Sequence, residues 1–255
     1  MIKDIIKKTK SYEGCTASFN EADIVLYGAG FDGTSSYRPG SRFAPQAIRS
    51  ETYFAQEDYS PYFDRDLTEK EIHDLGDVEI VFGNTTESLK RIENVSRHIV
   101  THHKIPVCIG GEHLVSLPAI KPLIEKFPEL RIIQLDAHLD LMDELFGDKY
   151  SHGSVMRRII EFFPDSHRLY QVGIRSGSRE EFVFAEKNTH LFRFHSAAFL
   201  EVLDDLKEKP VYLTIDLDVF DPSLIRGTGT PEAGGIFFQE YIELLKHVEH
   251  LNIVG

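Results

Sequence analysis

Short runs of β-branched and other apolar residues recur along the chain, separated by longer segments with helical periodicity. The apolar runs, which we expect to form strands, lie near residues 25, 108, 133, 172, 191 and 214, with a last one at the C-terminal end. Residues 84–100 have the clearest helical pattern, because Leu89, Ile92, Val95 and Ile99 recur at a spacing of three or four. This alternation predicts an α/β protein with a mainly parallel sheet covered by helices on both faces.

We expect one domain over residues 1–255, because the sequence has no internal repeat, low-complexity tract or linker rich in Pro, Gly and Ser. The chain ends in HVEHLNIVG, a pattern typical of a helix followed by a strand that has only begun. A natural domain seldom ends at the start of a central strand. We therefore expect the domain to lack its C-terminal strand and helix here, through truncation or disorder.

A glycine-rich segment, GAGFDG, follows the first predicted strand and places Gly28, Gly30 and Gly33 in the GxGxxG spacing of dinucleotide-binding proteins. That function requires a helix directly after the glycines, so that the helix N-terminus meets the pyrophosphate. Pro39 and Gly40 follow instead, in a segment that cannot form such a helix. We interpret the segment as a loop at the sheet edge, not as a nucleotide site.

Polar side chains gather where three of the predicted strands end. They come from the segments GGEH, LDAHLD and DLD, and are His113, Asp136, His138, Asp140, Asp216 and Asp218. A single Asp at such a place could be the N-cap of the next helix, and a single His could be an ordinary, partly buried side chain. Parallel strands end at one edge of a sheet, and alternate residues of a strand share a face. We therefore expect the whole set to converge, with the two carboxylates and the imidazole of LDAHLD on one strand face.

Four carboxylates and two imidazoles cannot remain ionised together without cations nearby. Six ligands exceed what one ion with an open position needs, so the pattern predicts two divalent ions bridged by carboxylates. Oxygen and nitrogen donors without thiolates favour Mn²⁺, and Zn²⁺, Co²⁺ and Ni²⁺ are also possible. Two such ions can supply the nucleophile of a metal-assisted hydrolase.

Composition and charge narrow the class of partner. With 41 Asp and Glu against 28 Lys and Arg, the net charge of −13 disfavours nucleic acid and anionic lipid and mildly favours a cationic ligand. Cys15 and Cys108 are the only cysteines, so we expect neither a disulfide framework nor a cysteine zinc site. We expect no signal peptide and no membrane span, because the first residues lack a continuous apolar segment and no later run approaches membrane-spanning length. We expect a cytoplasmic protein.

The motifs GGEH, LDAHLD, LTIDLDVFDP and GTGTPEAGG, in this order, resemble the motif series of the ureohydrolases, the arginase and agmatinase family. YRPGSRFAPQAIR and GIRSGSREE also resemble segments of agmatinase-type members. The resemblance covers residues from about 25 to 255. It implies a three-layer α/β/α arginase-like fold, a pair of manganese ions, and a homo-oligomer, either a trimer or a hexamer.

The resemblance also implies which residues bind each ion. One ion would be held by His113, Asp136, Asp140 and Asp216, and the other by Asp136, His138, Asp216 and Asp218. Asp136 and Asp216 would then bridge the ions, and Asp140 would also pass a proton to the departing amine.

Two loop residues match further positions of the family. Glu232, in GTGTPEAGG, matches the glutamate that pairs with the substrate guanidinium, and the alternative is a loop carboxylate that caps a turn. His152, in YSHGS, matches the proton-shuttling histidine that lies beside the substrate, and the alternative is a solvated loop histidine.

The implied reaction is hydrolysis of a guanidinium to urea and an amine. Agmatine, which would give putrescine for polyamine biosynthesis, is favoured because FGDKYSHG replaces the Ser/Asn-rich segment of arginases. Glu180 and Glu181 would suit a substrate without a carboxylate, although they could equally be first-turn helix charges. Arginase, guanidinobutyrase and formimidoylglutamase activities are alternatives. A single-zinc deacylase of the same fold and a catalytically silent metal-binding protein are alternatives from other classes.

Overall fold

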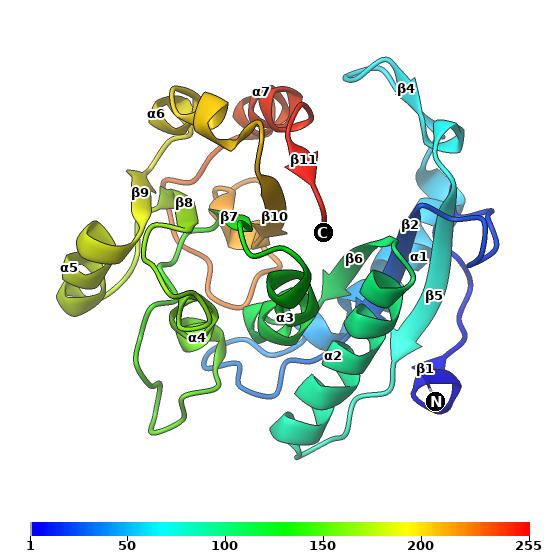
Figure 1. The fold of residues 1–255 in the computed structure, drawn as a ribbon, viewed down its shortest axis with the longest axis horizontal. Coiled ribbons are helices and arrows are strands. Elements are labelled where there is room, and N and C mark those ends of the chain that lie inside the picture. Colours follow the sequence, from blue (N-terminus) through cyan, green and yellow to red (C-terminus); the bar gives the residue numbers. More distant parts are fainter. Residues whose placement is uncertain (1) are drawn as a thin grey trace. The chain divides into compact units, whose positions relative to one another are not determined.

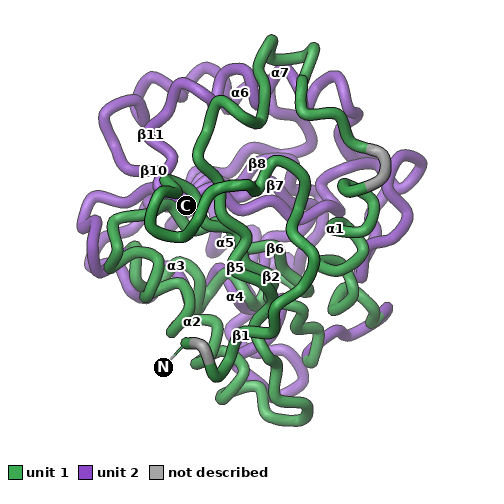
Figure 2. Tube along the Cα trace, turned by 90° about the vertical axis from the view of Figure 1, so that its right-hand side faces the viewer, with its two compact units in different colours: residues 1–33, 39–123 green, residues 34–38, 124–255 purple. Residues whose placement is uncertain are grey.

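The computed structural model describes residues 2–255, which form two compact units. Unit 1 comprises Met1–Gly33 and Pro39–Leu123, and unit 2 comprises Thr34–Arg38 and Ile124–Gly255 (Figure 2). Each unit has its own mainly parallel β-sheet. The single domain over residues 1–255 stays a prediction.

Unit 1 contains a four-stranded sheet. In spatial order its strands are β1 (Ile6–Lys7), β5 (Ile72–Val78), β2 (Ile24–Ala29) and β6 (Ile105–Gly110). The last three strands are parallel to one another, and β1 is antiparallel to β5. The chain passes from β2 through α1 (Ala44–Ala55) to β5, and then back past β2 through α2 (Thr85–Thr101) to β6. Because right-handed crossovers in opposite directions lie on opposite faces, α1 and α2 cover the two faces of this sheet (Figure 1).

Helix α2 forms where the sequence has its clearest helical spacing of apolar residues. The Asn84 side chain accepts a hydrogen bond from the Glu87 backbone N–H at 3.0 Å, which caps the helix N-terminus. Ile92, Val95 and Ile99 are fully buried against the sheet side. The helix predicted from residues 84–100 is therefore confirmed, and its apolar stripe is the face that packs.

Unit 2 contains a five-stranded, fully parallel sheet. In spatial order its strands are β11 (Asn252–Ile253), β10 (Pro210–Ile215), β7 (Arg131–Leu135), β8 (Leu169–Ile174) and β9 (His190–Arg193).

The helices of unit 2 divide between the two sheet faces. The connections through α4 (Val155–Ile160) and α5 (Arg179–Asn188) run from β7 to β8 to β9 in one direction. The chain then returns through α6 (Ala197–Leu200) to β10 and through α7 (Phe238–Val248) to β11 in the opposite direction (Figure 1). By the same handedness rule, α4 and α5 cover one face and α6 and α7 the other.

The core of unit 2 lies between its sheet and these helices. Ile133, Leu135 and Val211 of the strands are fully buried together with Phe199 and Leu244 of the helices. Burying one such side chain contributes about 1.5–3 kcal/mol to folding. The predicted parallel sheet with helices on both faces is confirmed in each unit.

Short elements connect the larger ones. The remaining helices are η1 (Ile2–Asp4), η2 (Ser41–Phe43), η3 (Leu67–Glu69), η4 (His113–Val115), α3 (Ser116–Lys126), η5 (His152–Ser154), η6 (Leu203–Leu206) and η7 (Leu217–Val219). A small hairpin pairs β3 (Tyr59–Ser60) with β4 (Arg65–Asp66).

The glycine-rich segment after β2 is a close-packed loop. The next α-helix begins only at Ala44, which confirms that no helix starts directly after Gly33. A Cβ atom on Gly28 would lie 1.9 Å from Asp77 Oδ1, and one on Gly30 would lie 2.5 Å from the Arg42 carbonyl oxygen. These glycines therefore allow neighbouring segments of unit 1 to approach the backbone, which is a packing role.

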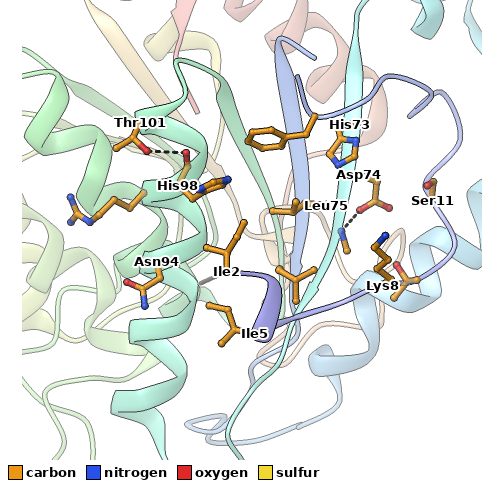
Figure 3. A pocket seen from close by; sticks show the side chains of 15 residues that line it. Ile2, Ile5, Lys8, Ser11, His73, Asp74, Leu75, Asn94, His98 and Thr101 are labelled. Carbon is orange, nitrogen blue, oxygen red and sulfur yellow. Dashed lines mark hydrogen bonds between the residues drawn. The ribbon is translucent and has the colours of Figure 1, made fainter. Parts of the chain in front are cut away.

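Unit 1 also has a pocket of 1410 Å³ between the N-terminal segment, β5 and α2 (Figure 3). Ile2 and Ile5 lie on one side, His98 and Thr101 of α2 on another, and His73 comes from β5. None of the predicted metal ligands is among the described residues that line it, so the pocket is separate from the predicted chemistry.

Candidate metal centre

Strands β7 and β10 bring acidic residues together because they are neighbours in register. Leu135 pairs with Ile215 at the carboxyl ends of the two strands. The next residues are Asp136 and Asp216, and the Asp216 N–H donates to the Leu135 carbonyl at 2.8 Å. The expectation that polar residues of separate strands meet at one sheet edge is therefore confirmed for these two.

Asp136, His138 and Asp218 form a group whose possible ligand atoms all lie within 4.8 Å of one another. His138 Nδ1 is 3.0 Å from Asp218 Oδ2 and 3.7 Å from Asp136 Oδ1. The side chains of Asp136 and Asp218 are only 1% and 3% exposed. Two buried carboxylates this close need a compensating cation. Carboxylate oxygens with an imidazole nitrogen are a donor set that fits a divalent ion such as Mn²⁺.

The electrostatics of this group show the same need for positive charge. Burial alone would lower the pKa of His138, but hydrogen bonds and charges from Asp136 and Asp218 raise the pKa well above its usual range. Burial, followed by the charge of Asp136, raises the pKa of Asp218. A protonated His138 imidazole offsets only one of the two negative charges. A divalent cation would offset both carboxylates and would displace that proton.

Backbone hydrogen bonds hold the carboxylates in place. Asp136 Oδ1 accepts from the His138 N–H at 2.7 Å, and Asp218 Oδ1 accepts from the Ala137 N–H at 3.1 Å. Asp216 caps the short helix η7 by accepting from the Asp218 N–H at 3.0 Å. The N-cap role considered for a single Asp therefore applies to Asp216, and its role as a bridging ligand stays a prediction.

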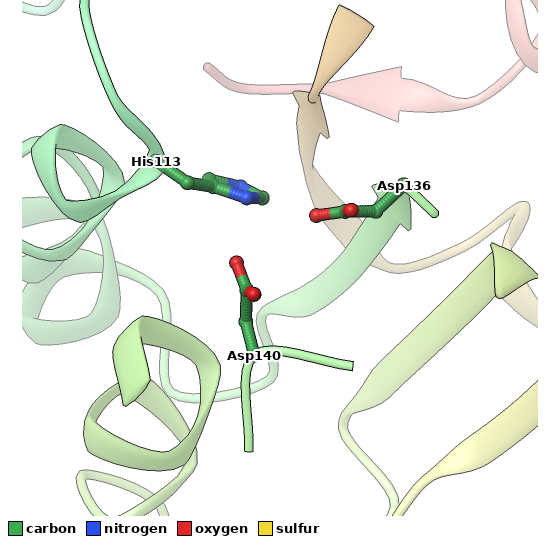
Figure 4. Close-up of side chains that lie close together, drawn as sticks. All are labelled: His113, Asp136 and Asp140. Atoms are coloured by element: carbon green, nitrogen blue, oxygen red, sulfur yellow. The ribbon is translucent and has the colours of Figure 1, made fainter. Parts of the chain in front are cut away.

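Asp140 lies beyond a sharp change of backbone direction. Its φ of 54° is in the left-handed region, which is unusual for a residue other than glycine. Its carbonyl accepts from Met156 and Arg157 at the start of α4, at 3.0 and 3.1 Å. Carboxylate oxygens of Asp136 and Asp140 lie within 4.8 Å of each other, and Figure 4 shows the two side chains pointing toward a common space. A strained buried residue of this kind often marks a functional site.

The expectation that Asp136, His138 and Asp140 alternate along one strand is wrong. Strand β7 ends at Leu135, and after it only an isolated bridge between His138 and Ser176 continues the pairing. The positive φ of Asp140 then ends the alternation. The carboxylates of Asp136 and Asp140 come close because a turn redirects Asp140, not because the pleat repeats.

His113 belongs to unit 1, where it begins η4 just beyond the carboxyl end of β6. Its side chain is buried, with 7% of the residue exposed. The glycines before it permit this path, since a Cβ atom on Gly111 would lie 2.1 Å from the Phe31 carbonyl oxygen. His113 therefore lies just beyond the carboxyl end of a strand, as the sequence predicted.

His152 contacts a segment more than one hundred residues away in the sequence. Its Nε2 lies 3.0 Å from Ser36 Oγ, and its Nδ1 lies 3.5 Å from Thr34 Oγ1. Its backbone N–H also donates to Thr34 Oγ1 at 3.1 Å. The imidazole is therefore held by two hydroxyl groups, which is unlike a freely solvated loop histidine.

Arg175 anchors the loop that carries Glu232. Its guanidinium donates to the Glu232 carbonyl at 2.8 Å, to the Ala233 carbonyl at 3.1 Å and to the Asp218 carbonyl at 2.6 Å. Further donations at 3.1–3.4 Å reach the carbonyls of Gly173, Val219 and Phe220. One side chain thus holds the segment of Asp218 and the segment of Glu232 to the end of β8.

Comparison with known proteins identifies the family. Residues 22–255 match the family model described as Arginase family. The chain belongs to the arginase family. It is 44% identical over 241 residues to the agmatinase of Bacillus subtilis, covering 93% of this chain and 82% of that protein. It is 37% identical over 242 residues to the N(1)-aminopropylagmatine ureohydrolase of Thermococcus kodakarensis, covering 92% and 81%.

A solved structure supports the same assignment. The crystal structure of a candidate agmatinase from Clostridium difficile matches with a TM-score of 0.89 and 44% identity, covering 92% of this chain and 86% of that one. This arginase-family chain therefore has the three-layer α/β/α fold that the sequence motifs implied. The recognition of a ureohydrolase is confirmed.

Glu181, one of the two glutamates predicted to suit the substrate, has a local structural role. Its carboxylate accepts from the Ser178 N–H at 2.8 Å, in a capping box at the start of α5, and from the Leu141 N–H at 3.1 Å. Glu181 is also buried, whereas Glu180 is exposed. The alternative of a first-turn helix charge therefore describes Glu181, and substrate contact by Glu180 stays a prediction.

Sequence reasoning gave no role to Arg175, although a signal was present. Arg175 comes directly after the fully buried strand LYQVGI, at the carboxyl end of a parallel sheet. A charged side chain at such a place is expected to have hydrogen-bond partners, and the nearby backbone carbonyl groups can supply them.

Among residues 2–255, every helix is too short or too polar to cross a lipid bilayer.

Proposed function

We propose that this arginase-family chain hydrolyses agmatine to putrescine and urea with two manganese ions. The observation that carries the proposal is the group of Asp136, His138 and Asp218, in which both carboxylates are buried and the donor atoms lie within 4.8 Å of one another. The names of three relatives from Bacillus species, each an agmatinase at 43–44% identity, support agmatine as the substrate.

The ligand sets follow the family motifs. We propose that one ion is held by His113, Asp136, Asp140 and Asp216, and that the other is held by Asp136, His138, Asp216 and Asp218. Mixed oxygen and nitrogen donors, without thiolates, fit manganese. When bound, two divalent ions supply a hydrolytic nucleophile at neutral pH and polarise the substrate.

The other side chains of the proposed site bind the substrate and transfer protons. The Glu232 carboxylate binds the cationic guanidinium by charge-assisted hydrogen bonds, and Arg175 keeps that loop in place. Asp140 transfers a proton to the departing amine nitrogen, so that a neutral amine leaves. His152, oriented by Thr34 and Ser36, exchanges protons with bulk water, a role to which an imidazole side chain is suited.

A substrate panel tests the proposal. Protein loaded with Mn²⁺ would be assayed for urea release from agmatine, N(1)-aminopropylagmatine, arginine and guanidinobutyrate, and for formamide release from formiminoglutamate. We expect urea from agmatine at the highest kcat/KM, and loss of activity in EDTA that Mn²⁺ restores. Asp218→Asn is the matched inactive control, because it keeps the shape of a proposed ligand and removes its charge.

Outcomes of the panel separate the alternatives. Faster turnover of the aminopropyl compound would assign the chain to the chemistry named for its Thermococcus relative. No product from any of these compounds by the metal-loaded protein would contradict the enzyme proposal. A trimeric or hexameric state and a cytoplasmic location stay predictions, which size measurement in solution and cell fractionation would test.

A further inference from the structure

A row of buried polar side chains crosses the sheet of unit 2 just before the strands end. Gln134 of β7 pairs in register with Gln171 of β8 on one side and with Thr214 of β10 on the other. Both glutamines are fully buried, and Thr214 is 6% exposed. Parallel strands covered on both faces normally carry apolar residues. Buried amides at these positions therefore call for an explanation, since an amide is costly to bury without partners.

Gln134 connects this row to the proposed metal site. Its Nε2 donates to Asp136 Oδ2 at 2.7 Å and to the His138 carbonyl at 3.1 Å. Asp136 Oδ1 is held at the same time by the His138 N–H at 2.7 Å. Both oxygens of the Asp136 carboxylate are thus fixed, which restricts rotation of the group.

Two further side chains support Gln134 from behind. Gln171 Nε2 donates to Gln134 Oε1 at 2.8 Å and to the Leu139 carbonyl at 2.8 Å. The Thr189 hydroxyl, at the C-terminal end of α5, lies 3.0 Å from both Gln171 Oε1 and the Ala185 carbonyl oxygen. A chain of polar contacts therefore runs from Thr189 through the two glutamines to Asp136.

The partners of this chain allow one orientation of each amide. If Gln134 were flipped, its oxygen would face the Asp136 carboxylate and the His138 carbonyl, and both acceptors would lose their donor. The same holds for Gln171, whose amide nitrogen serves Gln134 and Leu139. The chain therefore has a fixed direction, with donors pointing toward Asp136.

We propose that Gln134, Gln171 and Thr189 are positioning residues that orient Asp136 for metal binding. A neutral amide suits this role because it holds the carboxylate and leaves its negative charge to the metal ion. A lysine or arginine in the same place would neutralise Asp136 and compete with the ion. The inference rests on the proposed metal site, and it concerns residues that do not touch the ion.

Metal affinity tests this inference separately from activity. Gln134→Leu keeps the size of the side chain and removes its hydrogen bonds to Asp136 and His138. We expect the dissociation constant for Mn²⁺, measured by calorimetry on the metal-free protein, to rise by about 10–100-fold, as is typical when a group that orients a metal ligand is removed. Thr189→Val acts two links away, so we expect a smaller rise in the same direction.

The control is Ser196→Ala. The Ser196 hydroxyl is also buried in unit 2 and donates to Glu240 at 3.0 Å, but it lies outside the chain of hydrogen bonds. We expect Ser196→Ala to lower the melting temperature of the metal-free protein without changing Mn²⁺ affinity. If Gln134→Leu does not fold, Thr189→Val carries the test, because it exchanges a hydroxyl for a methyl group.

Two results would overturn the inference. One is an unchanged Mn²⁺ affinity in Gln134→Leu, or in Thr189→Val where that variant carries the test, whatever the loss in melting temperature. The other is a wild-type protein that binds no Mn²⁺, because Asp136 would then not be a ligand of this ion. A wild-type protein that binds Mn²⁺ but releases no urea would contradict only the proposed function.

Discussion

His152 Nε2 lies 3.0 Å from the Ser36 hydroxyl, and the two residues are 116 positions apart in the sequence. The Thr34 hydroxyl lies 3.5 Å from the other ring nitrogen, Nδ1, and accepts a hydrogen bond from the His152 backbone N–H. The segment that follows the glycine-rich loop thus holds the histidine proposed to move protons. Its role is structural support of a proposed catalytic residue, which the GxGxxG spacing gave no reason to expect.

We predict that Ser36→Ala lowers kcat for agmatine by about 5-fold, because one hydrogen bond contributes about 1 kcal/mol to the position of the imidazole. KM should change little, since Ser36 is not assigned to substrate binding. Steady-state kinetics would measure both constants. Ser18→Ala is the control, because its hydroxyl pairs with Glu21 in unit 1 at 2.6 Å. An unchanged kcat in Ser36→Ala would contradict the prediction.

Stabilisation by Mn²⁺ should increase with pH. The folded pKa of His138 is raised, so in the metal-free protein its protonation contributes stability that is present at low pH and is lost as pH rises through the folded pKa. Asp218 also has a raised pKa, and its contribution decreases with rising pH in the same way. Protons therefore compete with the metal, and binding must release them.

Thermal unfolding with and without Mn²⁺, at pH values from 6 to 9, would measure this effect. We expect the gain in melting temperature on adding Mn²⁺ to grow across that range. Calorimetry in buffers of different ionisation enthalpy should show proton release, and His138→Asn should reduce it. A gain that is independent of pH would show that His138 is not a ligand.

Arg175→Met should weaken substrate binding and stability together. The guanidinium serves carbonyl groups of three segments, and several of them would lose their donor. We expect the free energy of unfolding to fall by about 2–4 kcal/mol, since several part-buried carbonyl groups would lose their donor at once. KM for agmatine should rise because Glu232 is no longer held.

The measurement is urea-induced unfolding combined with steady-state kinetics. Arg193→Met is the matched control, because Arg193 makes an exposed pair with Glu186 at 3.1 Å. Exposed pairs contribute about 0–1 kcal/mol, so this variant should behave like the wild type. Equal effects of the two substitutions would remove the anchoring role from Arg175.

We predict that Gly28→Ala destabilises the protein, because Gly28 has a packing role and does not belong to a nucleotide site. A methyl group there would lie 1.9 Å from Asp77 Oδ1 and 2.8 Å from Pro45 Cβ, so the neighbouring segments must move. We expect the melting temperature to fall by several degrees, in line with about 1–3 kcal/mol for overpacking a close contact. Gly83→Ala is a poor match because Gly83 has a positive φ, whereas Gly227, with open space around it, is a suitable control. An NAD-dependent rise in melting temperature would contradict the packing interpretation.

The sequence by itself determined the parallel α/β architecture, the family and the residues at the strand ends. Periodicity depends on neighbours within one element, so it identifies buried faces such as Ile92, Val95 and Ile99 and predicts where strands stop. Motifs in a fixed order then located Asp136, His138 and Asp218. Periodicity and motifs are features of short segments, so they can be recognised in the sequence without the tertiary structure.

Only the tertiary structure decided how these residues are held. Asp140 reaches its place through a left-handed turn joined to α4, and His152 depends on Ser36. Arg175 and the chain of Gln134, Gln171 and Thr189 act through hydrogen bonds between segments that are separate in sequence. Such contacts are set by register and crossover direction, and no periodicity within a single strand or helix specifies which distant side chain will be opposite.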